Sequence, residues 1–166
     1  MILILMGVAG SGKTTVGRAL AARIGAPFFD ADDFHSEANR SKMARGAALN
    51  DEDRAGWLQV LSALIREWNA EVPLTLLACS ALKQTYRAFL EKDTEVRWIY
   101  LKGSRDLIAA RLAQRKNHFF DPVLLESQIK DLEEPSRAWV VDVSPDVDTI
   151  VSGLIEHLKE TNVLRR

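Results

Sequence analysis

A glycine-rich loop directly after a short apolar run is the feature that most constrains this sequence. Residues 2–5 (ILIL) are apolar, and residues 7–14 (GVAGSGKT) match the pattern G-x-x-x-x-G-K-[ST]. In this pattern the glycines let backbone N–H groups converge on phosphate oxygens, and the N-terminus of the next helix attracts negative charge. The order of strand, loop and helix therefore predicts an α/β protein with a phosphate-binding loop (P-loop).

The apolar runs along the rest of the chain agree with an α/β fold. Near-continuous apolar stretches, which are typical of parallel strands covered on both faces, predict strands at 2–6, 27–30, 74–79, 96–101 and 138–143. Helical patterns separate these strands. We predict a C-cap at Gly25 and N-caps at Ser80, Ser104 and Asp121. Residues 31–54 are a long polar insertion, which we expect to contain a short helix.

Length and charge narrow the class of protein. A chain of 166 residues suits one domain, and a net charge of −1 gives no general attraction to nucleic acid or to an anionic membrane. No run approaches the roughly 20 apolar residues of a membrane span. The single cysteine, Cys79, can form no internal disulfide. We therefore expect a soluble protein of the cytoplasm.

The P-loop itself predicts the ATP contacts. Lys13 is expected to reach the β- and γ-phosphates, and the Thr14 hydroxyl is expected to bind Mg²⁺. The predicted ATP-binding residues of the loop are Gly7, Val8, Ala9, Gly10, Ser11, Gly12, Lys13, Thr14 and Thr15.

Three classes of P-loop protein compete at this point. A GTPase needs a guanine-reading N-K-x-D motif, which is missing, and the D-x-x-G match at 53–56 (DRAG) follows polar residues rather than a buried strand. A larger ATPase normally ends its third strand with an acidic residue, but residues 76–81 here read LLACSA. A small-molecule or nucleotide kinase is therefore favoured.

An acidic cluster follows the second predicted strand. Asp30, Asp32 and Asp33 lie at the carboxyl end of that strand, where parallel sheets place their ligands. Three nearby carboxylates repel one another unless a cation or a hydrogen-bond donor offsets their charge. A solvated acidic turn is the alternative. We assign Asp30 to the Mg²⁺ site and Asp32 to the acceptor hydroxyl, as orienting group or base.

Two groups of basic residues suggest an anionic acceptor and a lid. Lys83 lies in the first turn of the predicted helix after the third strand, where a cation is unfavourable unless an anion is present, and Arg87 follows one turn later. Arg111 and Arg115 share one helical face and are predicted to lie over the transferring phosphoryl group. Solvated surface helices are the alternative for both groups, and the role of His118 stays open.

Taken together, these segments resemble the P-loop gluconokinases, which are related to shikimate and adenylate kinases. The resemblance runs from Gly7 to about Pro135, and its most particular parts are KMARGAALNDEDRAGWL (42–58) and ACSALKQTYR (78–87). It implies a P-loop NTPase fold of three layers (αβα), with a five-stranded parallel sheet in the order 2-3-1-4-5. Residues 1–166 would form a single kinase domain, with an acceptor-binding insertion at about 31–54 and a mobile lid at about 111–128.

The resemblance also implies an activity, ATP- and Mg²⁺-dependent phosphorylation of D-gluconate, and a homodimer. Adenine would pack near Arg111 and the loop at Ser144 and Pro145. The catalytic residues would be Lys13, Asp32, Arg111 and Arg115. The acceptor pocket would be lined by Asp32, Arg54, Lys83, Arg87 and His118, with Gln128 contributing from the lid.

The sequence departs from the family pattern at four positions, Ser36, Gly56, Asn117 and Phe120, none of which removes a charged candidate. Three other functions stay open. They are a kinase for another small hydroxy acid, a nucleoside monophosphate kinase, which usually has more arginines between strands 2 and 3, and a nucleotide-binding module without transfer activity.

Overall fold

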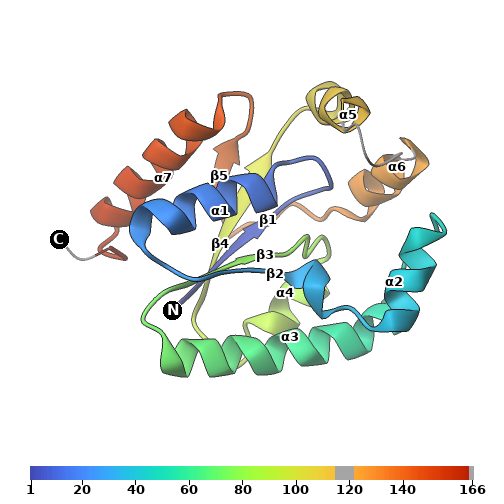
Figure 1. Cartoon of the computed structure of the whole chain (residues 1–166), viewed down its shortest axis with the longest axis horizontal. Coiled ribbons are helices and arrows are strands. Elements are labelled where there is room, and N and C mark those ends of the chain that lie inside the picture. The colour runs from blue at the N-terminus through green and yellow to red at the C-terminus, as the bar shows by residue number, and fades with distance from the viewer. Residues whose placement is uncertain (115–121, 165–166) are drawn as a thin grey trace.

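The computed structural model describes residues 1–114 and 122–164 and shows one parallel sheet of five strands. The strands are β1 (Ile2–Met6), β2 (Phe28–Asp30), β3 (Thr75–Ala78), β4 (Val96–Lys102) and β5 (Trp139–Asp142). They lie in the order β2-β3-β1-β4-β5, with every neighbouring pair parallel (Figure 1). The predicted sheet order is confirmed, and each predicted strand boundary falls within one residue of the observed one.

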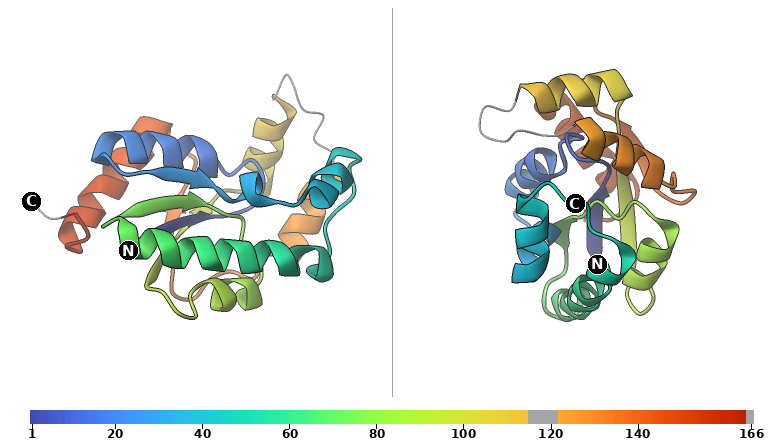
Figure 2. Two further views of the ribbon diagram at one scale, coloured as in Figure 1. Left: turned by 60° about the horizontal axis from the view of Figure 1, so that its bottom comes forward. Right: turned by 90° about the vertical axis from the view of Figure 1, so that its right-hand side faces the viewer.

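Helices cover both faces of the sheet. The helices α1 (Lys13–Ile24) and α7 (Val147–Glu160) lie together over one face, and α3 (Asp51–Glu71) and α4 (Gln84–Leu90) lie over the other (Figures 1 and 2). Alternating side chains of β1 supply both cores, because Leu3 and Leu5 pack on the side of α1 and α7 whereas Ile2 and Ile4 pack on the side of α3. The predicted three-layer αβα fold is confirmed.

Local capping explains where several helices begin and end. Gly25 closes α1 in the left-handed conformation (φ 69°), as predicted. The Ser104 side chain accepts a hydrogen bond from Leu107 N at the start of α5 (Arg105–Ala113), which confirms that N-cap. Helix α6 (Pro122–Asp131) begins at Pro122, and its predicted N-cap, Asp121, lies outside the described residues.

The predicted N-cap at Ser80 is wrong. Residues 79–82 form an irregular turn in which Ala81 has a positive φ of 41°, and α4 begins only at Gln84. The carbonyl oxygens of Ala81 and Leu82 both accept hydrogen bonds from the buried Arg87 guanidinium (2.8 and 2.9 Å), and Leu82 O also accepts one from Glu133 N (2.9 Å). The Glu133 carboxylate, from the segment after α6, accepts a hydrogen bond from Gln84 N at the start of α4 (2.5 Å).

The insertion at 31–54 contains the expected helical structure. It forms a 3₁₀ turn, η1 (Ala31–Phe34), and a short helix, α2 (Glu37–Ala44). Asn50 and Asp53 then form a reciprocal capping box at the start of α3. Lys42 donates to the Asp53 carboxylate (2.5 Å), which ties α2 to the first turn of α3. This link fixes the insertion beside the carboxyl ends of β1, β2 and β3.

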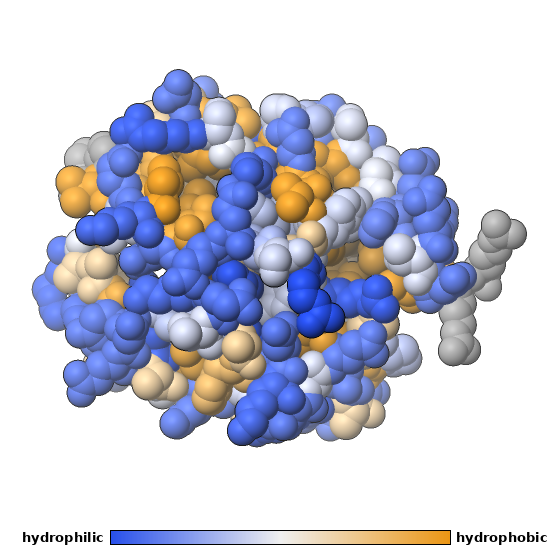
Figure 3. Space-filling view, turned by 180° about the vertical axis from the view of Figure 1, so that it is seen from behind, coloured by the Kyte–Doolittle hydropathy of each residue, from blue (hydrophilic) through white to orange (hydrophobic). Residues whose placement is uncertain are grey.

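The surface has no single continuous apolar face in the view of Figure 3, where apolar patches are broken up by hydrophilic side chains. Within residues 1–114 and 122–164, no helix combines the length and the apolar character that crossing a membrane requires.

Candidate active site

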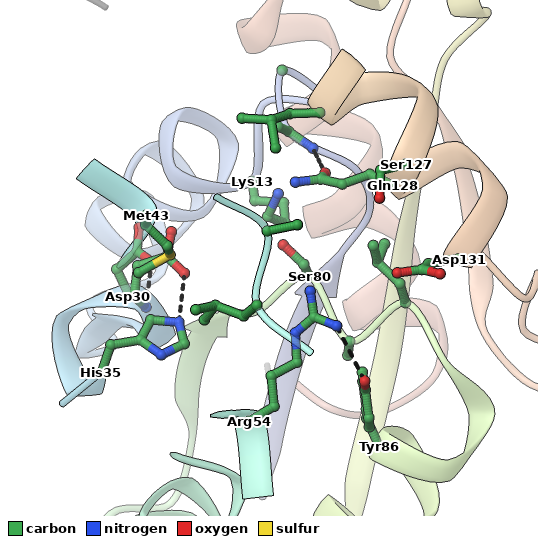
Figure 4. Close-up of a pocket in the computed structure, with 18 of the residues that line it drawn as sticks. Lys13, Asp30, His35, Met43, Arg54, Ser80, Tyr86, Ser127, Gln128 and Asp131 are labelled. Atoms are coloured by element: carbon green, nitrogen blue, oxygen red, sulfur yellow. Dashed lines mark hydrogen bonds and ion pairs between the residues drawn. The ribbon is translucent and has the colours of Figure 1, made fainter. Parts of the chain in front are cut away.

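A cavity of about 320 Å³ opens at the carboxyl end of the sheet, between the P-loop and the insertion. The P-loop, the end of β2, α3, α4 and α6 all contribute residues to its wall. In Figure 4, Lys13 and Gln128 lie at one end of this pocket and Arg54 and Tyr86 at the other. The sequence-predicted residues that line the cavity are Ala9, Gly10, Gly12, Lys13, Thr14, Thr15, Asp30, Asp32, Arg54 and Gln128.

The P-loop has the tight backbone that its glycines permit. Gly10 has a φ of 81°, and a Cβ at that position would lie 2.8 Å from Leu112 Cγ, so only glycine fits without a rearrangement. Lys13 Nζ donates to the carbonyl oxygens of Gly7 and Val8 (3.0 Å each), which holds its charge over the loop. Gly7, Val8 and Ser11 lie on the buried side of the loop.

Thr14 and Asp30 form an oxygen pair beside the loop. Thr14 Oγ1 donates to Asp30 Oδ2 (2.7 Å), so a hydroxyl and a carboxylate from α1 and β2 meet at one point. Mg²⁺ binds oxygen ligands and usually takes one or two protein groups together with phosphates and water. No group of three or more His, Cys, Asp or Glu side chains with metal-binding spacing is found in the described residues. The pair fits a metal that is bound together with a nucleotide.

Asp32 lies on η1 at the mouth of the cavity. The surrounding protein atoms and the charge of Asp30 raise the pKa of Asp32, and Lys13 opposes this rise. Because 78% of the Asp32 side chain is exposed, we expect the rise to be small. Asp32 Oδ1 lies 3.8 Å from Nε2 of His35, which is buried and stacked on Trp57 (ring centres 4.5 Å apart).

Arg54 reaches the cavity from the first turns of α3. Its Nη1 donates to Tyr86 Oη (3.2 Å), and its guanidinium carbon lies 5.6 Å from the centre of the Tyr86 ring. Tyr86 Oη in turn donates to Asp51 Oδ1. Lys83 Nζ donates to the same Asp51 oxygen (2.7 Å). A chain of contacts thus runs from the cavity wall to the surface.

Two predicted acceptor contacts have other places in the structure. Arg87 does not line the cavity: it is 2% exposed, and its guanidinium donates to the carbonyl oxygens of Ala81, Leu82 and Glu133. Lys83 is the N-cap residue of α4 and does not line the cavity either. The position of Lys83 predicted an anionic partner, and the anion that contacts Lys83 in the structure is Asp51 of the same chain.

The structure describes some, but not all, of the residues predicted for the lid and for adenine binding. Arg111 Nη2 donates to Val143 O (2.5 Å), so Arg111 lies beside the loop of Ser144 and Pro145, as the resemblance implied, but neither Arg111 nor Pro145 lines the cavity. Gln128 on α6 accepts a hydrogen bond from Ala9 N of the P-loop (2.6 Å). Arg115, His118, Asn117 and Phe120 lie outside the described residues.

Sequence reasoning missed several residues of the cavity wall. Tyr86 contacts Arg54 across 32 residues of sequence, so no local spacing pattern signals this contact. Apolar side chains of the insertion gave no signal either, because an apolar residue in a polar segment is not distinctive. The missed residues are His35, Met43, Ala47, Ala48, Leu49, Trp57, Ser80, Ala81, Leu82, Tyr86, Leu124, Ser127 and Asp131.

Known proteins share this fold and much of this sequence. The family model described as shikimate kinase matches residues 9–142. A probable gluconokinase from Mus musculus is 44% identical, over 95% of this chain and 97% of its own length. The thermoresistant gluconokinase of Escherichia coli strain K12 is 40% identical, over 96% of this chain and 94% of its own. The chain belongs to the gluconokinase family.

The solved structure of a gluconokinase from Sinorhizobium meliloti 1021 agrees with this assignment. It matches with a TM-score of 0.79 and 32% identity, over 96% of this chain and 95% of that one. Membership of the gluconokinase family therefore rests on sequence and fold together, and both cover nearly the whole chain.

Proposed function

We propose that this chain transfers the γ-phosphoryl group of ATP to D-gluconate, producing ADP and 6-phospho-D-gluconate. Membership of the gluconokinase family supports this function. The observation that carries it is the meeting of two kinds of group in one cavity. Lys13 and Thr14 of the P-loop lie at one end, and Asp32 and Arg54 line the wall beyond them. A phosphate donor and a hydroxy acid can therefore face each other.

The reaction needs positioning and charge stabilisation more than covalent chemistry. The bond between the β–γ bridging oxygen and the γ-phosphorus breaks, and the terminal hydroxyl oxygen of gluconate forms the new bond to phosphorus. Asp32 orients that hydroxyl and accepts its proton. Lys13 stabilises negative charge on the phosphate oxygens. Mg²⁺, held by Thr14 and Asp30, supplies further charge neutralisation for the phosphates when it is bound.

Arg54 is the acceptor-side cation in this proposal. Its guanidinium matches a carboxylate in shape and charge, which predicts that an acid is preferred over a neutral sugar. Arg115 and His118, outside the described residues, keep their proposed roles on the lid and at the acceptor. The single domain with its lid at about 111–128, the homodimer and the cytoplasmic location also stay predictions.

A coupled assay of ADP release tests the proposed function. The protein is supplied with Mg²⁺ and ATP, and gluconate, other aldonates, shikimate and AMP are offered in parallel. We expect release that depends on gluconate. Turnover of a different acid alone would replace the substrate and keep the mechanism, and no acceptor-dependent release from folded, ATP-binding protein would contradict a transferase function.

The role of Asp32 gives a first specific prediction. We expect Asp32→Asn to lower kcat for gluconate by roughly 10²- to 10⁴-fold, which is the usual contribution of a positioned acid or base. Asp33→Asn is the matched control, because Asp33 is an exposed neighbour that does not line the cavity. Steady-state kinetics of both variants measures the difference. Equal activity of the two variants would show that Asp32 is not the hydroxyl-orienting group.

A further inference from the structure

The cations that face the acceptor need to be held in place, and the structure shows how Arg54 is held. Within the described residues, the cavity is lined by two side chains that are cationic at neutral pH, Lys13 and Arg54. Lys13 lies on the P-loop with its charge over the loop carbonyls. Arg54 lies on the opposite wall, so the direction of its guanidinium decides how a carboxylate is received (Figure 4).

Tyr86 contacts Arg54 in two ways. Its hydroxyl accepts a hydrogen bond from Arg54 Nη1 (3.2 Å), and its ring lies beneath the guanidinium carbon at 5.6 Å. The Tyr86 side chain is buried (7% exposed), and it belongs to the core between the sheet and α3. A rigid ring anchored in a packed core is a firm support for a long, flexible arginine.

Asp51 sets the direction of the Tyr86 hydroxyl. A tyrosine hydroxyl has one proton, and an ionised carboxylate can only accept. The Tyr86 proton is therefore given to Asp51 Oδ1, and an oxygen lone pair is left for Arg54. Lys83 donates to the same Asp51 oxygen (2.7 Å), and hydrogen bonds from Lys83 and Tyr86 lower the pKa of Asp51. The carboxylate that orders the chain of contacts thus stays ionised.

We propose that Tyr86 is a positioning residue that aims the Arg54 guanidinium at the carboxylate of the acceptor, with Asp51 and Lys83 fixing the direction of its hydroxyl. This inference rests on the proposed function, because it assumes an acidic acceptor at Arg54. It also gives Lys83 a role in acceptor recognition that acts through Asp51 and Tyr86 rather than by direct contact.

Tyr86→Phe tests the proposal with little disturbance of packing, because the ring stays and only the hydroxyl is lost. We expect KM for gluconate to rise about tenfold, which corresponds to about 1.4 kcal/mol, while kcat and the KM for ATP change much less. The ratio of kcat/KM for gluconate to that for its uncharged amide, gluconamide, should fall by a similar factor. A merely structural role would lower kcat/KM equally for both acceptors and leave this ratio unchanged.

A second variant and a control complete the test. Asp51→Asn changes an exposed surface carboxylate rather than a core residue, so it keeps the proposal testable if Tyr86→Phe fails to fold. We expect it to lower the gluconate-to-gluconamide ratio as well, and the double variant to be no worse than the more affected single variant. Tyr100→Phe is the control, because Tyr100 is equally buried and does not line the cavity.

The outcomes separate this inference from the proposed function. A wild-type protein that does not phosphorylate gluconate contradicts the proposed function itself. A wild-type protein that does so, with a gluconate-to-gluconamide ratio unchanged in both Tyr86→Phe and Asp51→Asn, overturns the role of Tyr86 alone.

Discussion

His35 illustrates how its surroundings change the chemistry of one side chain. The imidazole is buried, stacks on Trp57, and has no hydrogen-bond partner for Nδ1 among the described residues. Burial lowers the pKa of His35 to about 4, and the charges of Arg54 and Arg40 act in the same direction. His35 is therefore neutral at pH 7 and can lie beside Arg54 without repelling it.

This lowered pKa predicts how stability depends on pH. In the unfolded chain a histidine takes up a proton near pH 6.5, whereas folded His35 does so only near pH 4. Between these values the unfolded state binds more protons, so the His35 contribution to the free energy of unfolding falls as the pH falls from 6.5 to 4. The total loss should be on the order of 3 kcal/mol.

Urea unfolding between pH 7 and pH 4 measures this loss. His35→Gln, which cannot take up the proton, should show a flatter dependence than the wild type over the same range. Parallel curves for the two proteins would mean that His35 titrates alike in the folded and unfolded states.

The sequence predicted the P-loop residues that the structure places at the cavity, and it predicted two acceptor candidates, Lys83 and Arg87, that do not line the cavity. The P-loop could be predicted because its residues act through backbone geometry that the glycines and Lys13 specify locally. The positions of Lys83 and Arg87 could not be predicted in the same way, because the sequence shows a charge but not the group that the charge contacts. The partners, Asp51 and the carbonyls of residues 81, 82 and 133, become neighbours only through tertiary packing.

Two of the glycines within helices, Gly56 and Gly17, have contrasting surroundings. Gly56 is exposed in α3, and a Cβ there would meet no atom within 4 Å. Gly17 is buried in α1, and a Cβ there would lie 2.4 Å from Phe28 Cε2 on β2. The first glycine weakens its helix without a packing reason, and the second lets α1 approach the sheet closely.

These surroundings predict opposite effects for the same substitution. Gly56→Ala should raise the free energy of unfolding by about 0.5–1 kcal/mol, because alanine favours the helix. Gly17→Ala should lower it by about 1–3 kcal/mol, because the clash with the Phe28 ring outweighs that gain. Urea denaturation of both variants provides the comparison. A stabilised Gly17→Ala would mean that the Phe28 ring moves aside at little cost.

Element boundaries were predictable where a local cap determines them and not where a distant side chain does. Gly25 and Ser104 act within their own turn, and both predictions are confirmed. The start of α4 depends on Glu133, which lies 49 residues beyond Gln84. No pattern near Ser80 contains that information, so the helix was predicted to begin too early.

The whole molecule follows from the alternation of apolar strands and amphipathic helices, and its site follows from the sheet order. With β1 in the centre, the P-loop lies beside the ends of β3 and β4, and β2 brings Asp30 to within hydrogen-bonding distance of Thr14. The strand runs and the resemblance sufficed to predict this arrangement. The extent of the cavity wall required the structure, because residues from 9 to 131 contribute to it.

A site built from so much of the chain couples ligand binding to global stability. A non-hydrolysable ATP analogue at about 100 times its Kd should raise the free energy of unfolding by about 2.7 kcal/mol. For a protein of this size that corresponds to a rise in Tm of roughly 5–10 °C. If Thr14 and Asp30 hold Mg²⁺ with the nucleotide, part of this rise must depend on the metal.

Thermal unfolding with the analogue in Mg²⁺ and in EDTA isolates the metal-dependent part. We expect the wild type and Asp33→Asn to be stabilised more in Mg²⁺ than in EDTA, whereas Asp30→Asn should be stabilised nearly equally in both. The reason is that the neutral amide keeps the shape of Asp30 but removes the charge that attracts the cation. Full metal dependence in Asp30→Asn would move the metal site away from β2 and leave the P-loop and bound phosphates to hold the metal.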